Sequence, residues 1–175
     1  SNTTLANSFK AIAYNGNGGT QSITGTGFTP DLVWIKHRNE ANDNVLTDSI
    51  RGRGLLYPNG NDAQNQDSQL TSFDSDGFSL AYASGQNVKF NKSGGTYVAW
   101  CWKAGNTWQS NIDGSQGSTV NANTANGFSV VKWTGNGSSA KTLGHGLSAV
   151  PEMIMVKKLG ATQDWWVYNK YVDAT

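Results

Sequence analysis

Residues that could carry out catalysis are few and widely spaced in this chain. The sequence holds two glutamates, Glu40 and Glu152, and two histidines, His37 and His145. Neither histidine has a second His or Cys at metal-ligand spacing, and no G-x-S-x-G nucleophile motif is present. A carboxylate pair for glycoside hydrolysis is defined by its separation in space, so the sequence leaves that one enzymatic alternative open. We predict that the protein is not an enzyme and carries no cofactor.

One acidic segment begins like a calcium-binding loop. Asp74-Ser-Asp76-Gly77 offers two carboxylates at the right spacing, but the twelfth position is Gly85, where an EF-hand has a bidentate Glu. We therefore predict a tight turn in which Gly77 adopts a positive φ. Asp74 and Asp76 remain weak candidates for a metal site, and no metal is assigned.

Three aromatic residues near the end of the chain are candidates for contact with a ligand. Trp165 and Trp166 are adjacent, so in a strand they point to opposite faces and one of them is expected to be exposed. Tyr168 follows two positions later. An exposed ring beside Asn and Asp side chains offers what a sugar needs, an apolar face and partners for hydroxyl groups. The alternative for each ring is a place in the core.

A basic group forms the second candidate for ligand binding. Arg38 follows Lys36 and His37, and Arg51 and Arg53 lie a short distance downstream. Such a group is suited to an anionic sugar or lipopolysaccharide. The alternative is a solvated strand end.

The chain contains an internal repeat. Residues 9–18 match residues 128–137 at an offset of 119, and after a two-residue insertion Pro30 and residues 31–36 match Pro151 and residues 152–157. The second copy has no counterpart of residues 55–103. We predict a first domain over 1–105, followed by a linker and an incomplete second repeat over 106–175, which could instead complete one larger sandwich.

Composition and periodicity favour an all-β fold. Gly, Asn, Ser and Thr dominate the polar residues, and 19 aromatic residues supply a core: seven Trp, six Tyr and six Phe. Strands are expected at residues 9–14, 32–36, 45–50, 77–83, 96–103, 128–133, 153–158 and 165–168, and loops at 59–69 and 106–126. Strand 32–36 is mostly apolar, which favours burial on both faces. The spacing predicts a β-sandwich of the jelly-roll or concanavalin-like kind.

Charge and cysteine content exclude several classes. The 175 residues carry a net charge of +1, so we expect no nucleic-acid partner. No stretch reaches about 18 apolar residues, so we expect no membrane insertion. Cys101 is the single cysteine and is expected to be a buried small apolar residue. The chain opens without Met, which indicates a fragment or processed product.

Taken as a set, several strings resemble a tandem β-sandwich repeat found in tail-fibre and other virion proteins of marine and cyanobacterial phages. They are Lys132-Trp-Thr-Gly-Asn-Gly137, Gly144-His-Gly-Leu147, residues 30–36, Trp166-Val-Tyr168 and residues 97–102. The resemblance implies a structural module without a catalytic motif. The first copy has Gly25-Thr-Gly27 in place of the bend with His145, so that histidine is not expected to be essential.

From the resemblance we expect a virion component, located on the virion or outside the cell, in a tail fibre or appendage. Its loops would recognise a host-surface glycan or protein, and its other partners would be further copies of itself or other virion proteins. Three alternatives remain open: a bacterial lectin or adhesin module, a purely structural spacer, and a polysaccharide-degrading domain.

Overall fold

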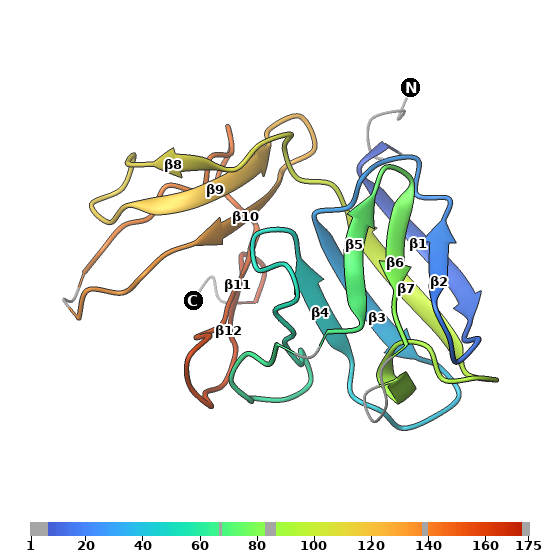
Figure 1. Ribbon diagram of the computed structural model, residues 1–175. Coiled ribbons are helices and arrows are strands. Elements are labelled where there is room, and N and C mark those ends of the chain that lie inside the picture. The colour runs from blue at the N-terminus through green and yellow to red at the C-terminus, as the bar shows by residue number, and fades with distance from the viewer. Residues whose placement is uncertain (1–6, 67, 83–86, 138–139, 173–175) are drawn as a thin grey trace.

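A computed structural model describes residues 7–66, 68–82, 87–137 and 140–172 of the chain (Figure 1). The described residues form antiparallel strand pairs and one short 3-10 turn, η2 (Asn87–Lys89), so the protein is all-β as predicted. Ala83, the last residue of predicted strand 77–83, lies outside the described residues. The strands are β1 (Phe9–Asn15), β2 (Gln21–Thr24), β3 (Leu32–His37), β4 (Val45–Asp48), β5 (Leu70–Asp74), β6 (Gly77–Leu80), β7 (Thr96–Trp102), β8 (Gln109–Asn111), β9 (Ser118–Asn123), β10 (Phe128–Lys132), β11 (Met153–Val156) and β12 (Trp166–Asn169).

Strands β1 to β7 form a two-layer unit. One sheet has the order β1-β7-β3-β4 and the other the order β2-β6-β5, and the two sheets share one hydrophobic core. Figure 1 shows the shorter sheet lying across the longer one. Both sheets supply side chains to this core, among them Ile23, Leu70, Phe78 and Leu80 from the shorter sheet and Val33, Ile35, Val45, Tyr97, Ala99 and Cys101 from the longer sheet.

Strand β7 is central to the longer sheet because it pairs with β1 on one side and β3 on the other. Its alternating sequence buries Tyr97, Ala99 and Cys101 completely and leaves Trp100 and Trp102 half-buried on the outer face. Burial raises the pKa of the Cys101 thiol to about 12, so this side chain stays neutral at physiological pH. The predicted division of the strand into two faces is confirmed.

Strand β3 corrects one expectation. Its burial alternates, with Val33, Ile35 and His37 buried and Leu32, Trp34 and Lys36 half-buried, so it is not covered on both faces. Its half-buried apolar residues Leu32 and Trp34 lie on the outer face of the longer sheet, where Trp34 is the cross-strand partner of Trp100. An apolar run therefore did not mean burial on both sides here.

The turn between β5 and β6 has the predicted geometry. Gly77 has a φ of 151°, and a Cβ at this position would collide with the carbonyl oxygen of Ile23 in the neighbouring strand β2. Asp76 accepts hydrogen bonds from the backbone N–H groups of Gly25 (3.1 Å) and Gly27 (2.6 Å). The carboxylate thus fixes the bend that follows β2 against the β5–β6 hairpin.

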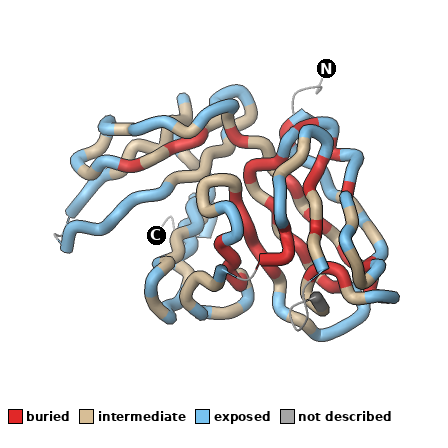
Figure 2. Tube along the Cα trace, in the orientation of Figure 1, coloured by how far each residue is buried: buried red, intermediate tan, exposed pale blue. Residues whose placement is uncertain are grey.

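The remainder of the chain forms two small sheets, with the orders β10-β9-β8 and β11-β12. The expected loop 106–126 is wrong in part, because it contains β8 and β9. Among the described residues of the expected loop 59–69 there is no strand. Strands β2 and β5 lie in segments for which we predicted no strand. Figure 2 shows that buried residues concentrate in the two-layer unit and that the later strands are mostly intermediate or exposed.

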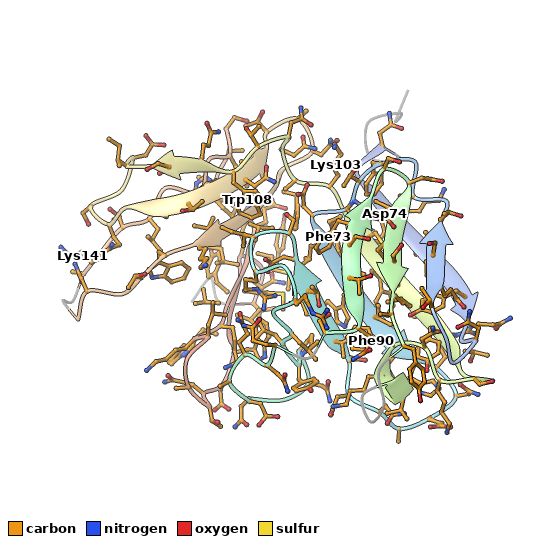
Figure 3. The ribbon with its side chains drawn as sticks, in the orientation of Figure 1. Phe73, Asp74, Phe90, Lys103, Trp108 and Lys141 are labelled. Atoms are coloured by element: carbon orange, nitrogen blue, oxygen red, sulfur yellow. The ribbon has the colours of Figure 1, made fainter. Side chains whose placement is uncertain are left out.

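A polar network connects the two-layer unit to the later strands. Asp31 precedes β3 and accepts hydrogen bonds from the Ser49 hydroxyl (2.8 Å), the Ala104 backbone N–H (2.9 Å) and the Asn121 side chain in β9 (3.0 Å). The indole N–H of Trp108 donates to the same Ser49 hydroxyl at 3.2 Å. Trp108 is seen in Figure 3 close to the junction between the yellow strands and the rest of the molecule.

Candidate functional site

A hollow with a volume of about 410 Å³ combines an aromatic ring with several polar side chains. Its lining residues are Asn59, Gly60, Asn61, Asp164 and Trp165. The first three belong to the loop after β4, and the last two to the loop between β11 and β12. Residues about a hundred positions apart in the sequence therefore meet at one surface.

Backbone hydrogen bonds hold the two loops together. Gln64 N–H donates to the Leu159 carbonyl and Gln163 N–H donates to the Asn61 carbonyl, both at 2.8 Å. The Trp165 indole N–H reaches two acceptors on the opposite loop, the carbonyls of Tyr57 (3.1 Å) and Gly60 (3.0 Å). Because its only polar atom is used in this way, Trp165 has a fixed orientation and can offer a ligand only its ring.

Polar side chains of the hollow are partly committed to each other. The Asn61 side-chain amide donates to Asp164 Oδ1 at 3.3 Å. An ionised carboxylate has a second oxygen, and an amide has a carbonyl oxygen, so both residues retain acceptor capacity for hydroxyl groups. Hydroxyl donors of a bound sugar could therefore replace water at these two side chains.

The Asn59 side chain is hydrogen-bonded to Asp43, which forms an ion pair with Lys89. It donates to Asp43 at 3.0 Å and accepts from the Asn44 backbone N–H at 2.8 Å. The hydrogen bond from Asn59 lowers the pKa of Asp43, assisted by Lys89, whose ammonium group is 3.3 Å from the carboxylate. Lys89 also lies over the Tyr57 ring at 4.1 Å. These contacts fix the Asn59 side chain in the lining of the hollow without any bound ligand.

The other two aromatic candidates lie on β12 and do not line the hollow. Trp166 is 70% exposed and Tyr168 is 41% exposed, whereas Trp165 is half-buried. The expectation that one of the adjacent tryptophans is exposed is confirmed for Trp166. Of the three aromatic candidates, only Trp165 joins polar side chains at a concave surface.

The arginine candidates have different environments. Arg38 is exposed, whereas Arg51 forms an ion pair with Asp48 (2.6 Å) in which the two side chains are only 5% and 7% exposed. Arg51 also donates to Gln64 at 3.3 Å. Arg53 donates to the Ser68 carbonyl at 3.0 Å. The contacts of Arg51 hold the chain after β4 in place and leave its guanidinium largely unavailable to a ligand.

The acidic candidates have structural partners. Asp76 binds the backbone of the bend after β2, and Asp74 accepts from the hydroxyl groups of Ser72 (2.8 Å) and Ser79 (2.7 Å). Figure 3 labels Asp74 at the β5–β6 hairpin. Within the part of the chain that the structure describes, no group of three or more His, Cys, Asp or Glu side chains is placed to hold a metal ion.

A second hollow of about 290 Å³ was not among the sequence candidates. It is lined by Trp34, Trp100 and Trp102 on the outer face of the longer sheet. The ring centroids of Trp34 and Trp100 are 6.1 Å apart in an edge-on contact. Trp102 stacks on Phe128 with a centroid distance of 6.2 Å and is tilted against Phe9 at 5.0 Å. The alternation of β7 placed Trp100 and Trp102 on one face, but the position of Trp34 depends on the β3–β7 register. The three indoles offer hardly any polar group to a sugar.

Comparisons with known proteins give one match. A family model described as a domain of unknown function (DUF7483) matches residues 5–175. No curated protein and no solved structure matches the chain. In the described part of the chain, no helix has the length and apolar character needed to cross a membrane.

Proposed function

The chain belongs to the DUF7483 family, and we propose that it is a non-catalytic module of a phage tail fibre or appendage that binds a host-surface glycan. The glycan occupies the hollow formed by the loop after β4 and the β11–β12 loop. This function places the protein on the virion, outside the cell. The resemblance of its strand and turn motifs to virion repeats supports the assignment to a fibre.

The observation that carries the proposal is the meeting of Trp165 with Asn61 and Asp164 at one concave surface. An indole ring covers the apolar face of a pyranose, and the amide and carboxylate oxygens accept its hydroxyl hydrogens. The ring is fixed by two hydrogen bonds, so binding costs little side-chain entropy. A single shallow site binds weakly, and several copies in a fibre would raise the avidity.

We also infer that the fold is built from two copies of one β-sandwich repeat. Strands β3 and β4 pair with Leu32 opposite Asp48 and Ile35 opposite Val45, and β11 and β12 pair with Met153 opposite Asn169 and Val156 opposite Trp166. Each residue of the second hairpin lies 121 positions after its counterpart. The bond from Ser49 N–H to the Asp31 carbonyl also recurs, from Lys170 N–H to the Glu152 carbonyl, and both measure 2.9 Å.

The bends before these hairpins support the same inference. Gly18 and Gly137 have φ values of 76° and 75°, and Gly27 and Gly146 have φ values of 77° and 70°, with 119 positions between the members of each pair. Thr26 Oγ1 accepts from Phe28 N–H at 3.4 Å, and at the equivalent place His145 Nδ1 accepts from Leu147 N–H at 3.0 Å. Two unlike side chains thus make the same bond at the same turn.

Binding of the purified chain to a glycan array, and to host cells with and without their surface polysaccharide, tests the glycan function. We expect Asn61→Ala combined with Asp164→Ala to reduce binding at least about tenfold, which corresponds to about 1.4 kcal/mol. Asp62→Ala is the matched control, since Asp62 is exposed in the same loop and does not line the hollow. Trp166→Ala controls for the neighbouring exposed ring.

Each outcome of this experiment has a definite meaning. Unchanged binding by the double variant, with loss in Trp166→Ala, would move the site to the surface of β12. Absence of binding to every glycan and to both cell preparations would overturn the glycan function and favour a spacer. Release of reducing sugar from a bound polysaccharide would show an enzyme. The bacterial lectin or adhesin alternative shares the site and differs only in the particle that carries it.

A further inference from the structure

Among the described residues that line the proposed glycan site, one side chain is charged, and it is acidic. Asp164 is exposed and belongs to the loop between β11 and β12, which lies beside the loop after β4 (Figure 1). The other lining residues are uncharged, namely Asn59, Gly60, Asn61 and Trp165. No Lys, Arg or His side chain belongs to this described lining. A surface of this kind attracts positive charge and repels negative charge.

Three basic side chains in the surrounding segments have other partners. Lys157 Nζ donates to two backbone carbonyls of its own loop, at 2.9 and 3.4 Å. Lys89 is paired with Asp43 at 3.3 Å, and Arg51 forms the nearly buried ion pair described above. None of these three cations forms an ion pair with Asp164, so they leave its negative charge exposed at the hollow.

The side-chain groups that remain for a ligand in this hollow are mostly hydrogen-bond acceptors. The Trp165 indole N–H is already bound to carbonyls of the opposite loop, and Asn59 and Asn61 each donate one amide hydrogen to a carboxylate. Asp164 accepts from Asn61 at Oδ1, which leaves Oδ2 and the Asn61 side-chain oxygen for a ligand. An ionised carboxylate accepts hydrogen bonds and never donates them. A ligand group that donates several hydrogen bonds therefore fits this lining better than one that only accepts.

We propose that the hollow selects a glycan unit that carries a free amino group and excludes uronic, sialic and sulfated units. This inference rests on the proposed glycan function and names the class of glycan that the site takes. The ammonium group of the bound unit donates to the Asp164 carboxylate and to the Asn61 side-chain oxygen. The Trp165 ring covers the apolar face of the same unit and attracts its positive charge further.

The charge of the sugar substituent decides the selectivity. A hydrogen bond from an ammonium group to a carboxylate is stronger than one from a neutral hydroxyl group. Acetylation of the amino group removes its charge and adds a carbonyl acceptor, for which the lining has few donors. A carboxylate or sulfate on the sugar would face Asp164 as a like charge. The arginines that the sequence suggested for an anionic sugar are absent from the lining, namely Arg38, Arg51 and Arg53.

Three β-1,4-linked oligosaccharides of equal length test this selectivity, built from glucosamine, N-acetylglucosamine and glucuronic acid. Each is titrated into the full chain at mildly acidic pH, so that the amino groups are protonated. We expect the glucosamine oligomer to bind at least about fivefold more tightly than the acetylated one, and the glucuronic acid oligomer to bind most weakly. Asp164→Asn should abolish the preference, because it removes the charge and keeps an oxygen for Asn61. Asp62→Asn is the matched control, since Asp62 is exposed beside Asn61 and does not line the hollow.

A preference for the glucosamine oligomer that is lost in Asp164→Asn and kept in Asp62→Asn supports the proposal. Equal or tighter binding of the acetylated or the glucuronic acid oligomer overturns it and leaves the glycan function standing. A preference that falls equally in both variants would show attraction by diffuse charge and also overturns it, as does binding confined to array glycans without a free amino group. Absence of binding to every glycan overturns the glycan function itself, so the two failures are distinguishable.

Discussion

Asp31 Oδ1 lies 3.0 Å from the side-chain nitrogen of Asn121, and this hydrogen bond joins the entrance of β3 to β9 across 90 residues of sequence. Both residues are buried. The same carboxylate accepts hydrogen bonds from Ser49, which follows β4, and from Ala104, which follows β7. One side chain therefore connects two segments of the two-layer unit with β9 of the first small sheet. The position of β9 relative to β3 therefore depends on this carboxylate.

Replacement of Asp31 by Ala should be strongly destabilising. The change removes the acceptor of three hydrogen bonds and leaves their donors in a buried environment, which costs about 2–4 kcal/mol in the free energy of unfolding. Chemical denaturation of the variant measures the loss, with Asp62→Ala as the exposed control. A double-mutant cycle with Asn121→Ala isolates the bond between the two parts. A coupling energy near zero in that cycle would contradict its role.

The pH dependence of stability should report the burial of Asp31. Burial raises the pKa of this carboxyl above its ordinary value of 3.8, opposed by the hydrogen bonds from Ser49 and Ala104. The native state therefore holds the Asp31 proton more tightly than the unfolded state, and this contribution to stability is complete below pH 3.8 and is lost as pH rises through the raised pKa. The stability of the wild type relative to Asp31→Asn should decrease over that window. A difference that increases with pH would show a lowered pKa instead.

Arg51 and Arg38 should respond very differently to truncation. Arg51→Ala leaves Asp48 as a nearly buried carboxylate without its ion-pair partner, which should cost about 3 kcal/mol. Arg38→Ala removes an exposed side chain and should stay within about 0.5 kcal/mol of the wild type. Thermal and chemical unfolding measure both. Equal losses of stability in the two variants would mean that the Arg51–Asp48 ion pair is not formed in solution.

Gly77→Ala should destabilise the β5–β6 hairpin. The substitution places a Cβ against the carbonyl of Ile23 and forces Ala into a φ of 151°, for an expected cost of about 2 kcal/mol or more. Gly135→Ala is the matched control, because a Cβ at Gly135 meets nothing within 4 Å and its φ is not positive. The melting temperatures of the two variants give the comparison. A Gly77→Ala variant as stable as the control would place the hairpin away from β2.

Short-range sequence patterns predicted those features of the fold that depend on residues close together in the sequence. The alternation of β7 separated Tyr97 and Cys101 from Trp100 and Trp102, and the Asp76-Gly77 pair indicated the hairpin turn. Strands β8 and β9 were missed because polar residues dominate both, so neither shows an apolar period although half of the β9 residues are buried.

The candidate site was predictable only in part, for a different reason. Trp165 was singled out as an aromatic residue beside polar ones, but Asn59 and Asn61 lie more than a hundred residues away. Long-range hydrogen bonds between the two loops, from backbone and side chains, bring them together. The grouping of Trp34 with Trp100 likewise depends on strand register, which is a long-range property.

The central place of β7 has a consequence for synthesis of the protein. Strands β1 and β3 are translated well before β7 and have no partner in each other, since β7 separates them in the finished sheet. The ribosome must deliver Trp102 before the longer sheet is complete. Until then β1 lacks its described partner and one edge of β3 stays open, although β3 can already pair with β4 and the shorter sheet can form. Chaperone occupancy during translation should therefore rise until that point and fall after it.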